Sequence, residues 1–281
     1  MTLPSGLRQH APSDLIPARS TTHLAVQFAT RAARANLPAQ PDDSHSNLGW
    51  DNKIGGLISQ PIEAGTSVHQ IGVGFTPLRL VVLRDHQEIA STNLASMTVT
   101  NASEWLDTQL ASAGLKAAGP VELPYKLPPE VAVLTAFDTE DPSSIATLAA
   151  WFAFAHDELS AFAERHPQVS PGPSPVRNWP HHFDIATYVA LEPGDPETAK
   201  GIGVGLSPGD ESFHEPYFYI NPWPRPGPVG LPDIPDPGHW NTKGFVGMVI
   251  TASELLAAPD NLDFANHIDT LFATGRSLQG C

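Results

Sequence analysis

The segment PHHFDIAT holds a histidine and a carboxylate two residues apart, at His182 and Asp184, among apolar and β-branched residues. Alternate side chains of a strand point to the same face, so we expect His182, Asp184 and Tyr188 on one face and apolar residues on the other. A histidine and a carboxylate can bind a metal ion, move a proton or form a structural hydrogen bond. This segment is therefore the first candidate for a functional site.

A second segment, FHEPYFYINPWP, offers a carboxylate and two phenols at Glu215, Tyr217 and Tyr219. The same alternation predicts these three side chains on one face of a strand. Antiparallel pairing of this strand with PHHFDIAT would bring Glu215 close to His182 and Asp184. If the protein is an enzyme, we expect Glu215 and Asp184 to be its catalytic residues, with Glu215 moving a proton.

A third segment, SHSNLGWD, carries His45, Asn47 and Asp51, which alternation again places on one face. Two histidines and one carboxylate suit Zn(II), Fe(II) or Mn(II), so we predict His45, His182 and Asp184 as ligands of a divalent metal. A shift of register by one residue would exchange His182 for the histidine before it. The residues predicted to contact a small-molecule ligand are Asn47, Asp51, Tyr188, Tyr217 and Tyr219.

An internal repeat indicates how these segments are arranged. IGVGFTP at 71–77 recurs as IGVGLSP at 202–208, and a helical pattern that ends at a proline precedes each copy. We expect two related halves, at 21–130 and 131–281, each with a helix, several antiparallel strands and a closing helix. One face of each IGVG strand is apolar, and its glycines leave room on the other face for a ligand, a second backbone or a bulge.

The repeat predicts an α+β fold in which two pseudo-symmetric sheets face a cleft or a barrel-like lumen within one compact unit. Residues 1–20 are interrupted by prolines and are expected to form a disordered or extended tail. They lack the apolar run of a secretory signal, and we expect a cytoplasmic protein.

Composition narrows the classes of partner. The chain has 15 Lys and Arg residues against 30 Asp and Glu residues, a net charge of −15. This excess repels phosphate backbones and anionic lipids, so we expect no nucleic-acid and no membrane partner. The single cysteine, Cys281, excludes an internal disulfide and a zinc site made of thiolates. A transition metal would have to rely on histidine and carboxylate ligands.

The segments TTHLAVQFATRAARANLP, DDSHSNLGWD, GGLISQPI, PHHFDIAT and EPYFYINPWP, in this order, resemble a bacterial family of unknown function. The likeness runs from about Thr21 to Thr274 and is strongest at FDIA and PYFYINPWP. Many members of that family have a His-Trp-Trp-His stretch in place of SHSNLGW and no histidine pair before Phe-Asp, so the resemblance implies that His45 and Asp184 match the family better than His182 does. The resemblance implies a single structural unit and no assigned activity.

We therefore expect a protein with a small-molecule pocket, acting through a metal-dependent hydrolytic or oxidative step if it is catalytic. One alternative is a binding module without catalysis, in which the histidines are neutral hydrogen-bond partners. Another is an interaction protein whose sheet edges pair in a homodimer. The predicted pocket is lined by His45, His182, Asp184, Glu215, Tyr217 and Tyr219.

Overall fold

A computed structural model of the chain describes residues 3–95, 97–119, 121–195 and 198–281. Helices and antiparallel strands make up the fold, so the α+β class is confirmed. The chain forms two compact units, and each draws on more than one stretch of the sequence. The first unit comprises Met1–Asp14, Ala150–Val176 and Asp184–Cys281, and the second comprises Leu15–Ala149 and Arg177–Phe183.

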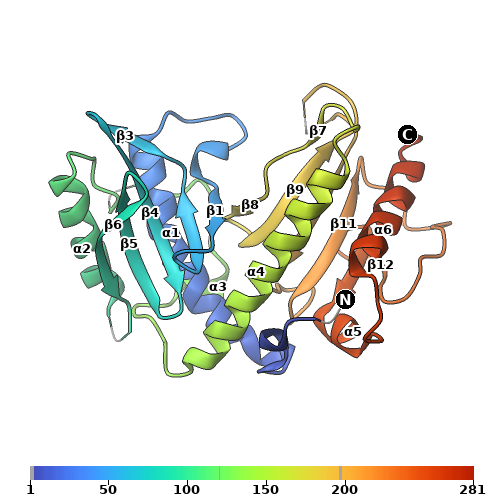
Figure 1. Cartoon of the computed structure of the whole chain (residues 1–281), viewed down its shortest axis with the longest axis horizontal. Coiled ribbons are helices and arrows are strands. Elements are labelled where there is room, and N and C mark those ends of the chain that lie inside the picture. The colour runs from blue at the N-terminus through green and yellow to red at the C-terminus, as the bar shows by residue number, and fades with distance from the viewer. Residues whose placement is uncertain (1–2, 96, 120, 196–197) are drawn as a thin grey trace. The chain divides into compact units, whose positions relative to one another are not determined.

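The first unit is built on an open antiparallel sheet with the strand order β12-β13-β11-β10-β9 (yellow to red in Figure 1), and β7 also pairs with β9. Its strands are β7 (Gly172–Pro173), β9 (Asp184–Ala190), β10 (Gly201–Ser207), β11 (Tyr217–Trp223), β12 (His239–Asn241) and β13 (Gly247–Thr251). Its helical elements are η1 (Ser5–Arg8), α5 (Ala252–Ala257), α6 (Phe264–Leu278) and the part of α4 (Pro142–Arg165) from Ala150 onward.

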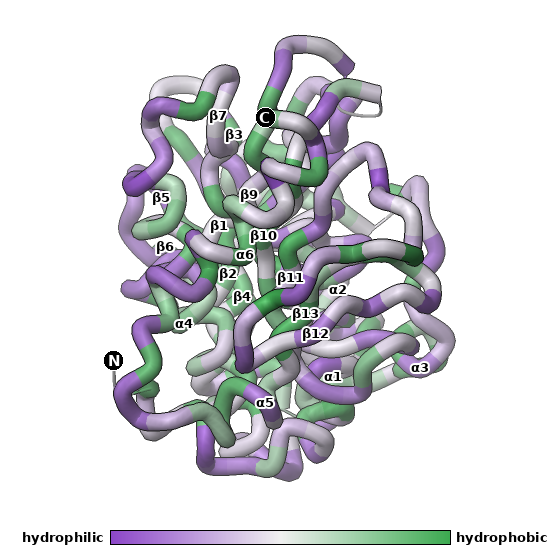
Figure 2. The backbone as a smooth tube through the Cα atoms, turned by 90° about the vertical axis from the view of Figure 1, so that its right-hand side faces the viewer, coloured by the Kyte–Doolittle hydropathy of each residue, from purple (hydrophilic) through white to green (hydrophobic). Residues whose placement is uncertain are grey.

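One face of this sheet forms the core of the first unit. Ile202, Val204 and Leu206 on the middle strand β10 are fully buried, which confirms the apolar face predicted for the second IGVG copy. Helix α4 covers this face, where the ring of Phe154 meets Phe218 of β11 edge-on with centroids 5.9 Å apart. Helix α6 contacts β10 and β11. Hydrophobic colour marks the chain at β13 in Figure 2, as burial of apolar surface requires.

The second unit contains antiparallel strands in the order β8-β1-β2-β4-β5-β6, and β3 also pairs with β4. Its strands are β1 (Leu48–Asp51), β2 (Gly56–Ser59), β3 (Ile62–Ala64), β4 (Ser67–Phe75), β5 (Leu78–Arg84), β6 (Gln87–Asn93) and β8 (Arg177–Trp179). Its helical elements are α1 (Ile16–Asn36), η3 (Ser44–Ser46), α2 (Val99–Ser112), α3 (Pro129–Ala132) and the start of α4. The short 3-10 turn η2 (Pro12–Leu15) contributes only its last residue, Leu15, to this unit.

Helix α1 packs against β2 and β4 and buries polar as well as apolar side chains. Leu24 and Phe28, which predicted an amphipathic helix, are buried. The helix ends before Pro38, because the ring of a proline disfavours helical geometry at the preceding residue. The buried polar residues of α1 are Arg19, Ser20, Thr21, Thr22, His23, Gln27 and Thr30.

The first twenty residues, predicted as a tail, include two short 3-10 turns and the start of α1. Leu7 and Leu15 in these turns are buried, and burial of apolar side chains holds such a segment against a core. Among the described residues, no helix combines the length and the apolar character needed to cross a bilayer.

Candidate functional site

The face of the first unit's sheet opposite its core gathers aromatic and polar side chains. Strand pairing places Gly205 of β10 opposite both Ala186 of β9 and Tyr219 of β11, so these residues share one face. We call this surface the tyrosine face. Its members are Asp184, Tyr188, Tyr217, Tyr219, Asn221 and Trp223.

Tyr219 reaches from β11 across the middle strand and donates a hydrogen bond from its hydroxyl to Oδ2 of Asp184 on β9. The path crosses Gly205, where a methyl group would lie 2.5 Å from Tyr219 Oη and 2.7 Å from Ala186 Cβ. Only a residue without a side chain fits beneath the phenol. Asp184 is 9% exposed, so the hydrogen bond satisfies a carboxylate that is almost removed from water.

A second tyrosine also lies across β10. A methyl group on Gly201 would fall 2.0 Å from Tyr188 Oη, whereas one on Gly203 would approach Tyr219 no closer than 3.7 Å. The glycines of the second IGVG copy therefore make room for tyrosine rings belonging to the neighbouring strands. In β4, the corresponding space at Gly72 is taken by Ile54, whose Cδ1 lies 2.8 Å from the position of an added methyl group. The predicted glycine groove is thus filled by side chains in both copies.

Tyr217, two residues before Tyr219, is fixed by a different carboxylate. Its hydroxyl donates a hydrogen bond of 2.6 Å to Oδ2 of Asp210, while Oδ1 of Asp210 accepts from the backbone amides of Ser212 and Phe213. The ring of Phe213 lies 4.8 Å from that of Tyr217. Asp210 is therefore held by its own loop and by Tyr217, a role that the sequence did not indicate.

Both phenols act as hydrogen-bond donors at neutral pH. Burial raises the pKa of Tyr219 well above its usual value, and the charge of Asp184 and the hydrogen bond to it raise that pKa further. Burial also raises the pKa of Tyr217, with Asp210 as the second cause. Loss of the proton from either hydroxyl at neutral pH is therefore opposed by the negative charge of its carboxylate neighbour.

The predicted pairing of the FHEPYFYINPWP strand with PHHFDIAT, which was to bring Glu215 close to His182 and Asp184, is wrong. Strand β10 lies between β9 and β11, so the two predicted strands are not paired with each other. Glu215 precedes the first residue of β11, Tyr217, and accepts hydrogen bonds of 2.8 and 2.6 Å from the backbone amide and hydroxyl of Ser253. It fixes the start of α5.

The strand at PHHFDIAT begins later than predicted. β9 starts at Asp184, and His182 is an exposed turn residue whose backbone amide donates to Trp179 O at 3.1 Å. Phe183 has φ 63°, a left-handed conformation that a strand cannot continue through. Asp184 and Tyr188 keep the predicted common face, and His182 does not join them on a strand.

The residues singled out in SHSNLGWD belong to the second unit and make local hydrogen bonds. His45 lies in the 3-10 turn η3 rather than on a strand, and its Nδ1 accepts from the Gln40 amide at 3.1 Å. Asn47 accepts from Gln60 Nε2 at 2.6 Å. Asp51 accepts from two backbone amides of the turn that follows β1. Their predicted part in a ligand or metal site remains a prediction.

Within the described part of the chain, no three or more His, Cys, Asp or Glu side chains are gathered as the ligands of a metal ion would be. His45 and His182 lie in the second unit and Asp184 in the first. The structure therefore does not assemble the predicted ligand set within one unit.

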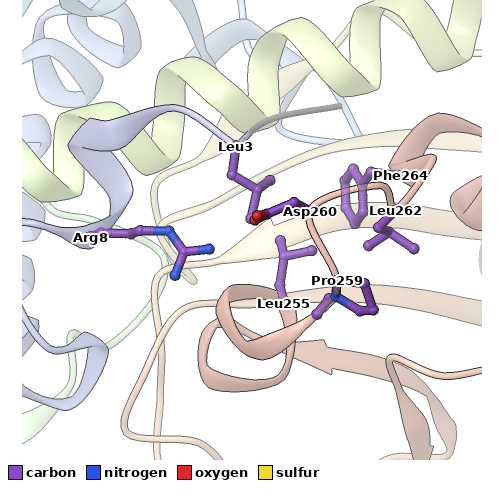
Figure 3. A pocket seen from close by; sticks show the side chains of 8 residues that line it. Leu3, Arg8, Leu255, Pro259, Asp260, Leu262 and Phe264 are labelled. Carbon is purple, nitrogen blue, oxygen red and sulfur yellow. The ribbon is translucent and has the colours of Figure 1, made fainter.

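The first unit also contains a small pocket of about 40 Å³ between η1 and the segment that joins α5 to α6 (Figure 3). Arg8 crosses this region, and its Nη1 donates to Leu256 O at 2.8 Å. A hollow of this volume holds little more than a water molecule or two. Its lining residues are Leu3, Arg8, Leu255, Ala258, Pro259, Asp260, Leu262 and Phe264.

Comparisons with protein families, with curated proteins and with solved structures found no match to this chain.

Proposed function

We propose that the protein is a small-molecule-binding module and that the tyrosine face of its first unit binds a small organic cation. The observation that carries this proposal is the Asp184–Tyr219 pair, which holds a buried carboxylate among aromatic rings. Tyr188, Tyr219 and Trp223 are each partly exposed as whole residues, although the Tyr219 hydroxyl itself is buried. A ligand can therefore reach the face.

The chemistry of this face favours positive charge. The face of an aromatic ring attracts a cation, by about 0.5–2 kcal/mol depending on how far water is excluded. Arg225 already lies over the Trp223 ring, with its guanidinium carbon 5.8 Å from the centroid. The net charge of −15 adds a long-range attraction for cations and a repulsion for anions.

Asn221 supplies a hydrogen-bond acceptor next to these rings. Its Oδ1 is enclosed, and within the described residues it has no hydrogen-bond donor. A buried acceptor without a donor costs about 1–3 kcal/mol. An ammonium group brings several donors, one of which would satisfy this oxygen.

Benzylamine is a suitable probe, and benzyl alcohol is its uncharged control. By isothermal titration calorimetry at pH 7, we expect benzylamine to bind the full chain and benzyl alcohol to bind at least tenfold more weakly. Asp184→Asn should weaken benzylamine binding at least tenfold. Arg84→Gln on β5 of the second unit should leave it unchanged. Equal binding of the amine and the alcohol, or unchanged affinity in the Asp184 variant, would contradict the proposal.

A metal-dependent hydrolytic or oxidative activity stays a prediction, as do the catalytic roles of Asp184 and Glu215, a homodimer and a cytoplasmic location. Metal analysis after refolding with Zn, Fe or Mn tests the metal directly. Retention of one metal per chain, lost in both His45→Ala and Asp184→Ala, would favour the enzyme over the binding module.

An internal duplication is part of the same proposal. The two IGVG copies lie in β4 and β10, and each strand is flanked by antiparallel partners on both sides. A long helix, α1 or α4, precedes the strands of each unit, and helices follow them. This common order supports descent from one ancestral unit whose second copy acquired the tyrosine face.

A further inference from the structure

One stripe of helix α1 carries four polar residues at helical spacing: His23, Gln27, Arg31 and Arg34. Residues three or four positions apart lie on the same side of a helix, so these side chains follow one another along α1. All four belong to the second unit, and the inference drawn from them does not depend on the proposed function of the first.

Three members of this stripe have partners from other segments of the second unit. His23 Nε2 lies 2.8 Å from Pro180 O. Gln27 donates to the same carbonyl at 3.0 Å, and its Oε1 accepts from the hydroxyl of Tyr125 at 2.7 Å. Arg34 pairs with Asp43 at 2.8 Å. Three of the four polar side chains in the stripe thus have hydrogen-bond or ion-pair partners within the unit.

Arg31 is the exception. Within the described residues it has no hydrogen-bond acceptor and no ion-pair partner, and its Nε is enclosed. The residue as a whole is partly exposed. A protein that leaves an enclosed guanidinium nitrogen without an acceptor loses the hydrogen bond that water would have made. An acceptor supplied by a ligand would restore it.

Aromatic rings stand beside this cation. Both Arg31 and Arg34 lie close enough to act electrostatically on the Tyr125 hydroxyl. The Tyr125 ring is 5.7 Å from the ring of His181, which is in turn 6.3 Å from Trp179. Burial lowers the pKa of His181 to about 4, so its imidazole is neutral at pH 7. The cluster therefore combines one uncompensated positive charge with an aromatic wall.

We propose that Arg31 binds the carboxylate of a small aromatic acid, whose ring packs against Tyr125 and His181. The guanidinium matches a carboxylate with two parallel hydrogen bonds. A ligand with a single negative charge fits this site better than a phosphate dianion. Arg34 is already paired with Asp43, and His181 is neutral at pH 7, so neither contributes a second positive charge. The aromatic wall adds affinity for a ring over a methyl group.

Benzoate is the probe for this site, with acetate and inorganic phosphate as comparisons, each titrated into the full chain by calorimetry at pH 7. We expect benzoate to bind at one site and more tightly than acetate or phosphate. Arg31→Gln should weaken benzoate at least tenfold, and Arg84→Gln, an exposed arginine on β5 of the same unit, should leave it unchanged. His181→Ala should weaken benzoate several-fold and leave acetate unaffected.

The stability of the ligand-free variant distinguishes a binding role of Arg31 from a structural one. Because the side chain has no partner to lose, Arg31→Gln without ligand should unfold at the same temperature as the wild type or higher, and benzoate should raise that temperature only in the wild type. Three results would overturn the proposal: no benzoate binding at millimolar concentration, unchanged affinity in Arg31→Gln, or tighter binding of phosphate than of benzoate. Loss of stability in ligand-free Arg31→Gln would mark the arginine as structural and overturn it as well.

Discussion

His23 stacks on Phe183, with ring centroids 4.9 Å apart and planes 8° from parallel. Its Nε2 lies 2.8 Å from Pro180 O, so the neutral ring donates to a carbonyl of the turn that precedes β9. His23 is 3% exposed. This one side chain thus joins α1 to the segment 180–183 by both a stacked contact and a hydrogen bond, and it does so in its neutral form.

Acid should therefore weaken the fold through His23. Burial is the main cause that lowers its pKa from 6.5 to about 4, and the charge of Arg19 and the nearby histidines lower it further. Between these pH values the unfolded chain binds a proton that the folded chain does not, so stability falls as pH decreases from 6.5 towards 4. The loss amounts to about 3 kcal/mol.

Urea unfolding of the wild type and of His23→Gln at pH 7.5, 6.0, 5.0 and 4.5 checks this expectation. The variant is less stable at pH 7.5 because it loses the stacked ring, but the difference should shrink as the pH falls. A constant difference across the range would mean that His23 is protonated as easily in the folded state as in the unfolded chain.

Two glycines of β10 provide a matched pair for testing the tyrosine face. Gly205→Ala places a methyl group 2.5 Å from Tyr219 Oη and should displace the phenol from Asp184, at a cost of about 1–3 kcal/mol. Gly203→Ala meets its nearest atom at 3.7 Å and should change stability by less than about 1 kcal/mol. Thermal unfolding compares the two. Equal effects would show that the Tyr219 ring does not lie over Gly205.

The residues of the tyrosine face show which structural features a local sequence pattern can predict and which it cannot. Alternation correctly placed Tyr217 and Tyr219 on one face, and it correctly buried Ile202 and Val204, because period-two order depends only on the chain being extended. The bond between Tyr219 and Asp184 was not predictable, since it requires an intervening strand and a glycine at the crossing point. Sequence alone had joined β9 directly to β11.

Two other failures have physical causes. His182 was assigned to a strand because its neighbours favour strands, but the left-handed backbone of Phe183 ends that geometry. In α1, the spacing of apolar residues predicted the helix correctly. It did not reveal the polar stripe of the helix, in which Gln27 takes its hydrogen-bond partners from Tyr125 and Pro180, far away in sequence. Local periodicity carries no information on such contacts.

A variant of Glu215 can distinguish its structural role from the catalytic role that the sequence predicted for it. Its carboxylate accepts from Ser253 at the start of α5, beside the Thr251 cap, which accepts from the Glu254 amide at 3.2 Å. Glu215→Ala and Thr251→Ala should each destabilise the protein by about 0.5–2 kcal/mol. Both should leave benzylamine affinity unchanged. A stable Glu215→Ala protein with lost ligand binding would instead assign Glu215 to the site.

Alkaline titration tests the protonation of the buried phenols. The chain has 4 tyrosines, and burial raises the pKa of Tyr125, Tyr217 and Tyr219 above 10. Above pH 10 the unfolded chain loses these protons while the folded chain keeps them, so stability falls as pH rises. Absorbance at about 295 nm should therefore show these three phenols ionising only as the protein unfolds, whereas all tyrosines ionise near pH 10 in urea.

Tyr219→Phe supplies the control for this titration. It removes one of the late-ionising phenols, so the absorbance step that accompanies alkaline unfolding should fall by about a third, while any ionisation near pH 10 stays the same. If the absorbance change near pH 10 became smaller instead, the Tyr219 hydroxyl would be exposed to solvent and would not donate a hydrogen bond to Asp184. The tyrosine face would then be a set of separate surface rings, without the buried carboxylate on which cation binding depends.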